Sequence, residues 1–226
     1  EIENQLEVGW ENMKIKKITR TLIAISFIIV IFDIARLDLW GTTNLLFLIW
    51  NLFLAWIPYI ISSFFIKKDT SLRNFALFFI FWLLFFPNAP YLVTDTLHIA
   101  SSLPVLLWYD SLLLFFFGWT GLLLGMLSLF NIHQYLKNHF SNLVSEISVF
   151  IICFVSSLGV YLGRFERWNS WDIFINPASL IRDLFYVLVD FVRIGNSWLF
   201  IAVFTVFMYS VYKVIYTLIT DKVELP

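Results

Sequence analysis

The sequence predicts an all-α fold, a polytopic bundle of about six transmembrane helices with one additional interfacial amphipathic helix. Three observations support this fold class. The chain of 226 residues is 60% hydrophobic and 14% charged, whereas soluble domains are about 45–50% apolar and about 25% charged. Its mean hydropathy is +0.84. Apolar runs long enough to cross a bilayer as helices recur along the chain, with short polar segments between them.

The charge balance and the cysteine content exclude several classes of protein. The formal net charge is −1 at pH 7, so no overall positive field attracts nucleic acid and we expect no nucleic-acid partner. Cys153 is the single cysteine, so the chain cannot form a disulfide of its own or a Cys-X-X-Cys metal or redox site. The expected partners are membrane lipids. The sequence leaves the oligomeric state open.

Composition divides the chain into three segments. A polar stretch with four basic residues near its end comes first, a long series of apolar runs follows, and a short polar tail comes last. We expect a cytoplasmic or interfacial N-terminal segment, a single transmembrane helical domain and a C-terminal tail. These segments cover residues 1–20, 21–219 and 220–226, respectively.

The first two spans are predicted at Thr21–Ala35 and Asn44–Ile66. The first is apolar except for Asp33, which lies one helical turn before Arg36 and can pair with it at the end of the helix. The second contains Pro58, which lipid tolerates where neighbouring groups satisfy the carbonyl that proline leaves free.

The third and fourth spans are predicted at Phe75 to about Leu92 and at Pro104 to about Phe130. Pro87 and Pro90 break or end the third span, because proline lacks a backbone donor and disfavours helical geometry before it. The fourth span has glycine at both ends of residues 121–125, a spacing that permits close contact between membrane helices.

The last two spans are predicted at Leu143–Leu162 and Trp198–Tyr216. Between them, Pro177–Arg193 is short for a span and carries Asp183 and Asp190 near one helical stripe. We therefore expect this segment to be the interfacial or partly inserted amphipathic helix.

The distribution of basic residues predicts the orientation. With the N-terminus in the cytoplasm, ten of the fifteen lysines and arginines fall on the inner side, and these ten include every lysine. Positive residues concentrate in cytoplasmic loops of membrane proteins. The sequence therefore predicts a cytoplasmic N-terminus and, with six spans, a cytoplasmic C-terminus.

Polar chemistry gathers in three motifs that this orientation places on the outer side. They read PNAPYLVTDTLH at residues 87–98, WYDSLLL at 108–114 and GRFERWNSWD at 163–172. The second motif sets Asp110 near the start of an apolar helix, where a carboxylate costs a few kcal/mol unless it faces the bundle interior and is paired. We expect the motifs to form one shared site at the extracytoplasmic face.

Asp95 and His98 share a helical face because they are three residues apart. They can hold a metal ion or act as a general base and its orienting carboxylate. The expected catalytic residues are Asp95, His98, Asp110 and Asp172. The expected substrate-binding residues are Asn88, Tyr91, Tyr109, Arg164, Arg167 and Asn169. A divalent metal, if one is bound, would be held by Asp95, His98 and Asp110.

Arginine is suited to binding a phosphate with two hydrogen bonds, which gives Arg164 and Arg167 an expected role on a phosphate-bearing substrate. Structural roles account for the same motifs. Asp95 can cap a helix and His98 can lie among lipid headgroups, while tryptophans and arginines in the third motif are typical of an interfacial anchor. The metal pattern also lacks an HExxH sequence and a second histidine on the outer side.

The three motifs together resemble the bacterial membrane proteins grouped under "domain of unknown function 1361". The resemblance covers about residues 40–215. It implies a multi-pass protein of the bacterial cytoplasmic membrane. It implies no reaction, and it transfers no catalytic residue to this chain.

The leading hypothesis from the sequence is a hydrolase or transferase that acts on a lipid-linked or cell-envelope substrate at the outer leaflet. The first alternative is a transporter or channel component whose polar motifs form an outer gate or an ion-coupling site. The second alternative is a non-enzymatic scaffold or sensor that binds a lipid or another membrane protein. The sequence does not identify a substrate.

Overall fold

Helices make up nearly all of the chain that the structure describes. A computed structural model describes residues 2–41, 43–101, 104–189 and 195–220, and within these ranges it contains no strand. The predicted all-α class is therefore confirmed. The elements are α1 (Ile2–Trp40), α2 (Phe47–Phe64), α3 (Leu72–Phe85), α4 (Asn88–Thr94), η1 (Asp95–Ser101), η2 (Pro104–Leu106), α5 (Leu107–His139), α6 (Asn142–Phe165), α7 (Asp172–Ile175), α8 (Pro177–Val189) and α9 (Gly195–Thr220).

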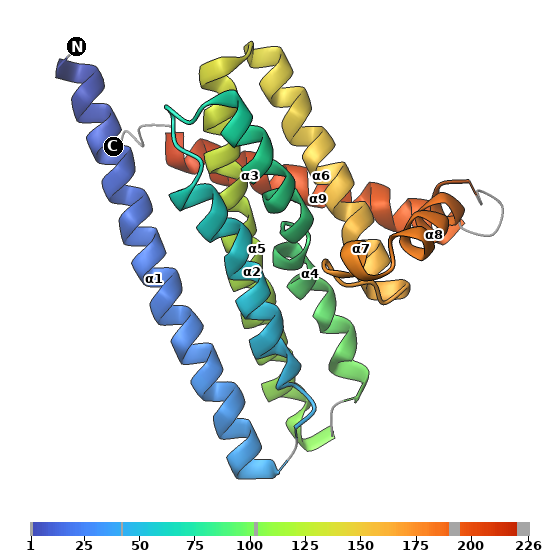
Figure 1. Cartoon of the computed structure of the whole chain (residues 1–226). Coiled ribbons are helices and arrows are strands. Elements are labelled where there is room, and N and C mark those ends of the chain that lie inside the picture. Colours follow the sequence, from blue (N-terminus) through green and yellow to red (C-terminus); the bar gives the residue numbers. More distant parts are fainter. Residues whose placement is uncertain (1, 42, 102–103, 190–194, 221–226) are drawn as a thin grey trace.

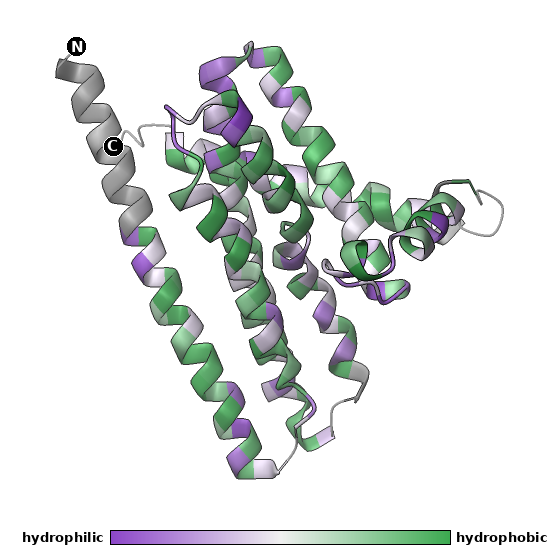
Figure 2. Ribbon diagram, viewed as in Figure 1, coloured by the Kyte–Doolittle hydropathy of each residue, from purple (hydrophilic) through white to green (hydrophobic). Residues whose placement is uncertain are grey.

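Five segments of the described chain are long and apolar enough to cross a membrane, and they coincide with the second to sixth predicted spans. They are Phe47–Phe64, Leu72–Ile99, Pro104–His139, Asn142–Phe165 and Ser197–Thr220. Figure 2 shows apolar residues along most of their length. The chain is therefore a membrane-embedded helical protein.

The first predicted span lies within α1, which is one continuous helix of 39 residues. It joins the N-terminal segment to the apolar run without a break. Phe27 and Ile31 are exposed on one side of this run, whereas Leu22 and Ile29 are buried on the other. α1 thus has an apolar outer face that lipid can cover and an inner face that packs on the bundle, mainly against α5.

The segment expected to be an interfacial helix forms α8, which has 13 residues. A helix needs about 20 residues to span a bilayer, and the described part of α8 is shorter than this. Val187 packs with Leu162 and Ile201 of the neighbouring helices, while Phe185 and Val189 are exposed. The end of the expected helix at residues 190–193 lies outside the described residues.

The third span is broken where the two prolines were expected to break it. α3 ends at Phe85 and α4 begins at Asn88. The Ala89 amide bonds to the Phe86 carbonyl at 3.2 Å, which leaves the Phe85 carbonyl free. The Asn88 side-chain amide donates to that carbonyl at 2.9 Å. A side chain thus satisfies the backbone group that the break exposes, as lipid requires.

Glycines let α4 pack closely between α5 and α6. A Cβ atom added at Gly121 would lie 2.7 Å from the Ala89 carbonyl oxygen, and one at Gly125 would lie 3.0 Å from the Ala89 Cβ. On the opposite side, a Cβ atom added at Gly159 would lie 2.8 Å from Pro87 Cγ. The expected packing role of the glycine pair in the fourth span is therefore confirmed.

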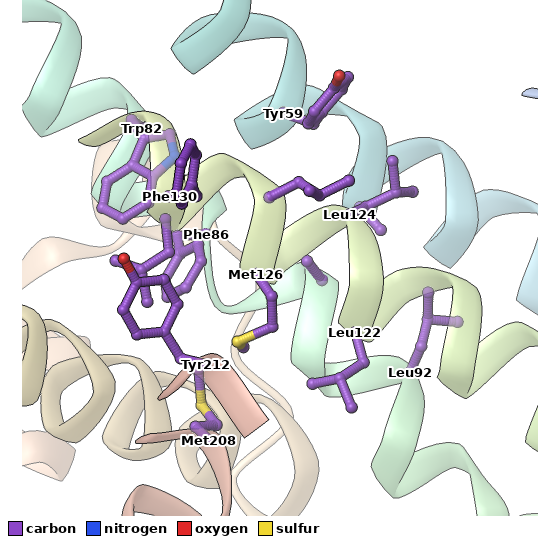
Figure 3. Close-up of a cluster of buried hydrophobic side chains, with 14 of the residues drawn as sticks. Tyr59, Trp82, Phe86, Leu92, Leu122, Leu124, Met126, Phe130, Met208 and Tyr212 are labelled. Atoms are coloured by element: carbon purple, nitrogen blue, oxygen red, sulfur yellow. The ribbon is translucent and has the colours of Figure 1, made fainter. Parts of the chain in front are cut away.

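The core lies around α5, which runs through the centre of the bundle in Figure 1. Figure 3 shows Phe86, Phe130 and Met126 near Tyr212 of α9. Trp82 is fully buried, stacks on Phe86 with ring centroids 4.4 Å apart and donates its indole N–H to Ser128 at 3.2 Å. Large aromatic rings therefore fill the interior around α5, and the indole N–H of Trp82 has a partner there.

Replacing Gly121 with alanine is expected to destabilise the bundle. The added methyl group would press on the α4 backbone, and overpacking of this kind costs about 1–3 kcal/mol. The better helix propensity of alanine offsets only part of this cost. Thermal unfolding of the purified protein in detergent measures the effect, with Ser111→Ala at an exposed position of the same helix as control. An unchanged unfolding midpoint for Gly121→Ala would contradict the close packing.

Candidate functional site

The three polar motifs lie at the lower end of the bundle in Figure 1 and along one side next to that end. α1 ends, and α2 and α5 begin, at the lower end in Figure 1, while η1 runs down towards the same end. The end of α6 and the short helix α7 lie to the right of these segments. The ionisable side chains in these segments form two groups with different partners.

The first group joins α1 to α5. Arg36 donates through Nε to Asp110 Oδ1 at 2.6 Å and through Nη2 to Oδ2 at 2.8 Å. Both side chains are at most 2% exposed. Tyr109 donates its hydroxyl to the Phe32 carbonyl at 2.8 Å. The two-bond geometry is the strong form of an arginine–carboxylate pair. We call this contact the α1–α5 ion pair.

The α1–α5 ion pair adds a partner that the spacing of the sequence did not indicate. The sequence allowed Arg36 to pair with Asp33 on the same helix, and the two do interact electrostatically, but Arg36 also binds Asp110, 74 residues further along the chain, with two hydrogen bonds. Local spacing identified a neighbour, whereas packing of α1 on α5 brought a better-oriented carboxylate. Asp33 is also buried, and its Oδ2 atom has no hydrogen-bond partner in the structure.

The second group gathers around Arg164 at the end of α6. Its guanidinium donates to Asp95 Oδ1 through Nη2 and to Thr94 Oγ1 through Nε at 3.0 Å. Its Nη1 lies 3.0 Å from His98 Nε2. Asn51 of α2 donates to the other oxygen of Asp95 at 3.0 Å. We call these five residues the Arg164 cluster.

The Arg164 cluster constrains the chemistry of its members. A guanidinium can only donate hydrogen bonds, so His98 Nε2 is the acceptor in this contact. Asp95 is fully buried, with both of its oxygens engaged. The Arg164 guanidinium also lies over the Tyr91 ring, 4.6 Å from its centroid. The cluster is therefore a neutralised and hydrogen-bonded ion pair that holds α2, α4, η1 and α6 together.

The residues expected to form one catalytic or metal site are divided between these groups. Asp95 and His98 face Arg164, whereas Asp110 faces Arg36. Asp172 accepts from the backbone and side-chain amides of Asn169 at 2.7 and 3.2 Å and so closes a local turn. Across the described residues, no group of three or more His, Cys, Asp or Glu side chains could hold a metal ion.

Arg164 and Arg167, which were expected to bind one phosphate together, have different surroundings. Arg164 is occupied within its cluster, whereas Arg167 is exposed. Arg167 has φ of +61° and follows the last turn of α6, where the Trp168 amide bonds to the Leu162 carbonyl at 3.2 Å. A left-handed residue at this position is a common way to end a helix.

A cavity of about 570 Å³ lies beside the Arg164 cluster, between α2, α3, α4, α6, α7 and α8. Its polar lining includes five side chains: Asn51, Asn88, Tyr91, Asn169 and Ser170. Asn88 donates to Ser170 Oγ at 2.9 Å and thereby connects α4 to the segment before α7. The volume of the cavity lies within the range of small-molecule binding sites.

The remaining walls of the cavity are mostly apolar. Leu83 of α3, Val155 and Leu158 of α6 and Leu180 of α8 are among the lining side chains. Ile80, also in the lining, is 65% exposed, so the cavity opens through the outer surface of the helices. The described lining includes no Asp, Glu, Lys, Arg or His.

Sequence reasoning found part of this lining and missed another part. Asn88, Tyr91 and Asn169 were expected to bind substrate and do line the cavity, whereas Tyr109 belongs to the α1–α5 contact. Asn51 was missed, although an amide within an apolar span is a signal for a buried polar contact. The apolar lining residues could not be predicted from the sequence, because their composition is that of any membrane helix.

Breaking the Arg164 cluster is expected to destabilise the protein strongly. Asp95→Asn and Arg164→Gln should each lower the free energy of unfolding by about 3–5 kcal/mol, because each leaves a buried charge without its partner. The double variant should lose less than the sum of the two single losses. Equilibrium unfolding in detergent measures all three. Arg167→Gln is the control, with a change below about 0.5 kcal/mol, and additive losses in the double variant would contradict the pairing.

The α1–α5 ion pair is expected to couple more strongly than an exposed pair in the same protein. A double-mutant cycle with Arg36→Met and Asp110→Leu should yield a coupling energy above about 1 kcal/mol. The matched cycle uses Lys213 and Glu146, which are 3.2 Å apart and 39% and 32% exposed. That pair should couple by at most about 1 kcal/mol. Equal coupling in both cycles would show that burial does not strengthen the first pair.

Comparison with known proteins identifies the family of the chain. A family model described as "Protein of unknown function (DUF1361)" matches residues 50–211. The matched range holds the whole Arg164 cluster and the cavity lining, but not α1. No curated protein and no solved structure is detectably similar to the chain. Because the match covers most of the chain, the resemblance noted in the sequence is confirmed, and the protein belongs to the DUF1361 family of membrane-embedded helical proteins.

Proposed function

We propose that the protein binds an amphiphilic membrane lipid, or a lipid-linked molecule, in the cavity beside the Arg164 cluster. One observation carries the proposal: the cavity has a polar lining at Asn51, Asn88, Tyr91, Asn169 and Ser170 and otherwise mostly apolar walls. Such a lining matches a ligand with a polar head and hydrocarbon chains. The lipid head would meet the polar side chains, and its chains would lie against α3, α6 and α8.

The mouth of the cavity supports entry of the ligand from the bilayer. Ile80 and Phe174 line the cavity and are 65% and 71% exposed. Ile80 lies in one of the segments that are apolar enough to cross the membrane, where an exposed apolar side chain can meet acyl chains, so a lipid could enter sideways without its chains crossing water. The proposed location is the cytoplasmic membrane of a bacterium, with the polar end of the cavity at the extracytoplasmic face.

Hydrolysis or group transfer on the same ligand is the second candidate function. The Ser170 hydroxyl lines the cavity, but the group that donates to its oxygen is the Asn88 amide, which cannot act as a base. Asp95 and His98 belong to the Arg164 cluster and are outside the lining. Binding therefore has better support than catalysis, and a chemically altered lipid after incubation would reverse this order.

Filling the cavity is expected to remove bound lipid. Val155→Trp places a large ring in the lining of the cavity, whereas Val203→Trp places the same ring on an exposed face of α9. Native mass spectrometry and lipid extraction of the purified proteins measure the lipid that each retains. Wild type and Val203→Trp should retain lipid in equal amounts, and Val155→Trp should lose most of it. Equal retention by all three, or no bound lipid in wild type, would overturn the proposal.

A further inference from the structure

We infer that the head group of the ligand is uncharged and rich in hydroxyl groups, as in a glycolipid, and is not a phosphate. This inference rests on the proposed function, because it names the class of lipid that the same cavity takes. The sequence alone suggested the opposite, a phosphate held by Arg164 and Arg167. Three features of the cavity favour the hydroxyl-rich head.

The first feature is the absence of a cation for a phosphate. The described lining has no lysine, arginine or histidine. Arg164 is the cation of the adjoining cluster, and all three of its nitrogens already meet Asp95, Thr94 and His98. Asp95 cancels its charge. A phosphate at this end of the cavity would therefore be desolvated without a counter-ion, which is strongly unfavourable.

The second feature is the hydrogen-bonding capacity that remains at the polar end. The side-chain amide of Asn88 donates one N–H to the Phe85 carbonyl and the other to Ser170 Oγ. The Phe85 carbonyl can only accept, so the amide nitrogen must face it and the orientation of the Asn88 side chain is determined. Asn88 therefore has only its carbonyl oxygen, an acceptor, left for a ligand.

Asn51 is oriented in the same way. One of its two N–H groups donates to Asp95 Oδ2 at 3.0 Å, while Arg164 holds the other oxygen of that carboxylate. The second N–H and the acceptor oxygen of Asn51 remain for a ligand. Acceptors bind hydroxyl donors, and a fully ionised phosphate has no donor to offer them. A hydroxyl group can use both the acceptor oxygens and the donors at this end of the cavity, whereas such a phosphate can use only the donors.

The third feature is the aromatic surface next to these amides. Trp50, Tyr91 and Trp168 all line the cavity. The indole N–H of Trp168 donates to Asp183 at 3.1 Å, so this ring meets a ligand mainly through its apolar surface. Flat apolar rings beside hydrogen-bonding amides suit a sugar ring, which has an apolar C–H face and a polar rim of hydroxyls.

The test compares two lipids with identical acyl chains, monoglucosyl diacylglycerol and phosphatidic acid, bound to the full-length protein in neutral detergent. Native mass spectrometry with both lipids present gives their relative affinity. The glucosyl lipid should bind at least about tenfold more tightly, the effect of roughly one well-made hydrogen bond to a desolvated group. Equal binding, or tighter binding of phosphatidic acid, would overturn the head-group inference and leave the proposed function intact.

Two tyrosine variants assign the selectivity to the cavity. Tyr91→Phe removes a hydroxyl from a lining residue and should weaken the glucosyl lipid several-fold with little effect on phosphatidic acid. Tyr186→Phe, at an exposed position of α8, is the matched control and should change neither affinity. A loss of equal size for both lipids in Tyr91→Phe would overturn the inference. Failure of both lipids to bind, or binding that Val155→Trp leaves unchanged, would instead overturn the proposed function itself.

Discussion

The buried contact between Asp95 and Arg164 is the constraint on which the rest of the structure depends. Asp95 begins the 3₁₀ segment after α4, and Arg164 lies near the end of α6, so the pair fixes the broken third span against the fifth. Asn51 extends the contact to α2. Glycines allow the close approach that the pair requires, with Gly121 on one side of α4 and Gly159 on the other. Charge pairing and small-residue packing therefore act on the same short helix.

Two buried ion pairs divide the polar chemistry of the three sequence motifs. Arg36 with Asp110 joins α1 to α5, and Arg164 with Asp95 joins the segment after α4 to α6. In lipid, a paired charge costs much less than an isolated one, so each pair removes a penalty that either residue alone would impose. The cavity lies beside the second pair, and its polar end is made of neutral groups supported by that pair. In the proposed function, this arrangement separates the buried charges, which join the helices, from the amides and hydroxyls, which would contact the ligand.

The sequence predicted the fold well because hydropathy determines the spans of a membrane protein almost by itself. The break at Pro87 and Pro90 and the close packing at the glycines also followed from local chemistry. The partner of Arg36 did not, since Asp33 and Asp110 are equally good carboxylates and only the packing of α1 on α5 distinguishes them. The sequence also grouped Asp95, His98, Asp110 and Asp172 into one site, only because all four were expected at the same depth of the membrane. The structure divides them among separate contacts. Several segments can reach one level without their side chains meeting.

Asn88 illustrates how tightly the fold and the site are combined in this protein. Its amide satisfies the Phe85 carbonyl at the helix break and at the same time holds Ser170 at the edge of the cavity. A substitution there would change the ligand contacts and expose a backbone carbonyl to lipid in a single step. If the cavity takes a lipid as proposed, adaptation to a different head group would therefore have to begin at Tyr91 or Ser170, where a hydroxyl can be exchanged without removing the amide that satisfies the Phe85 carbonyl.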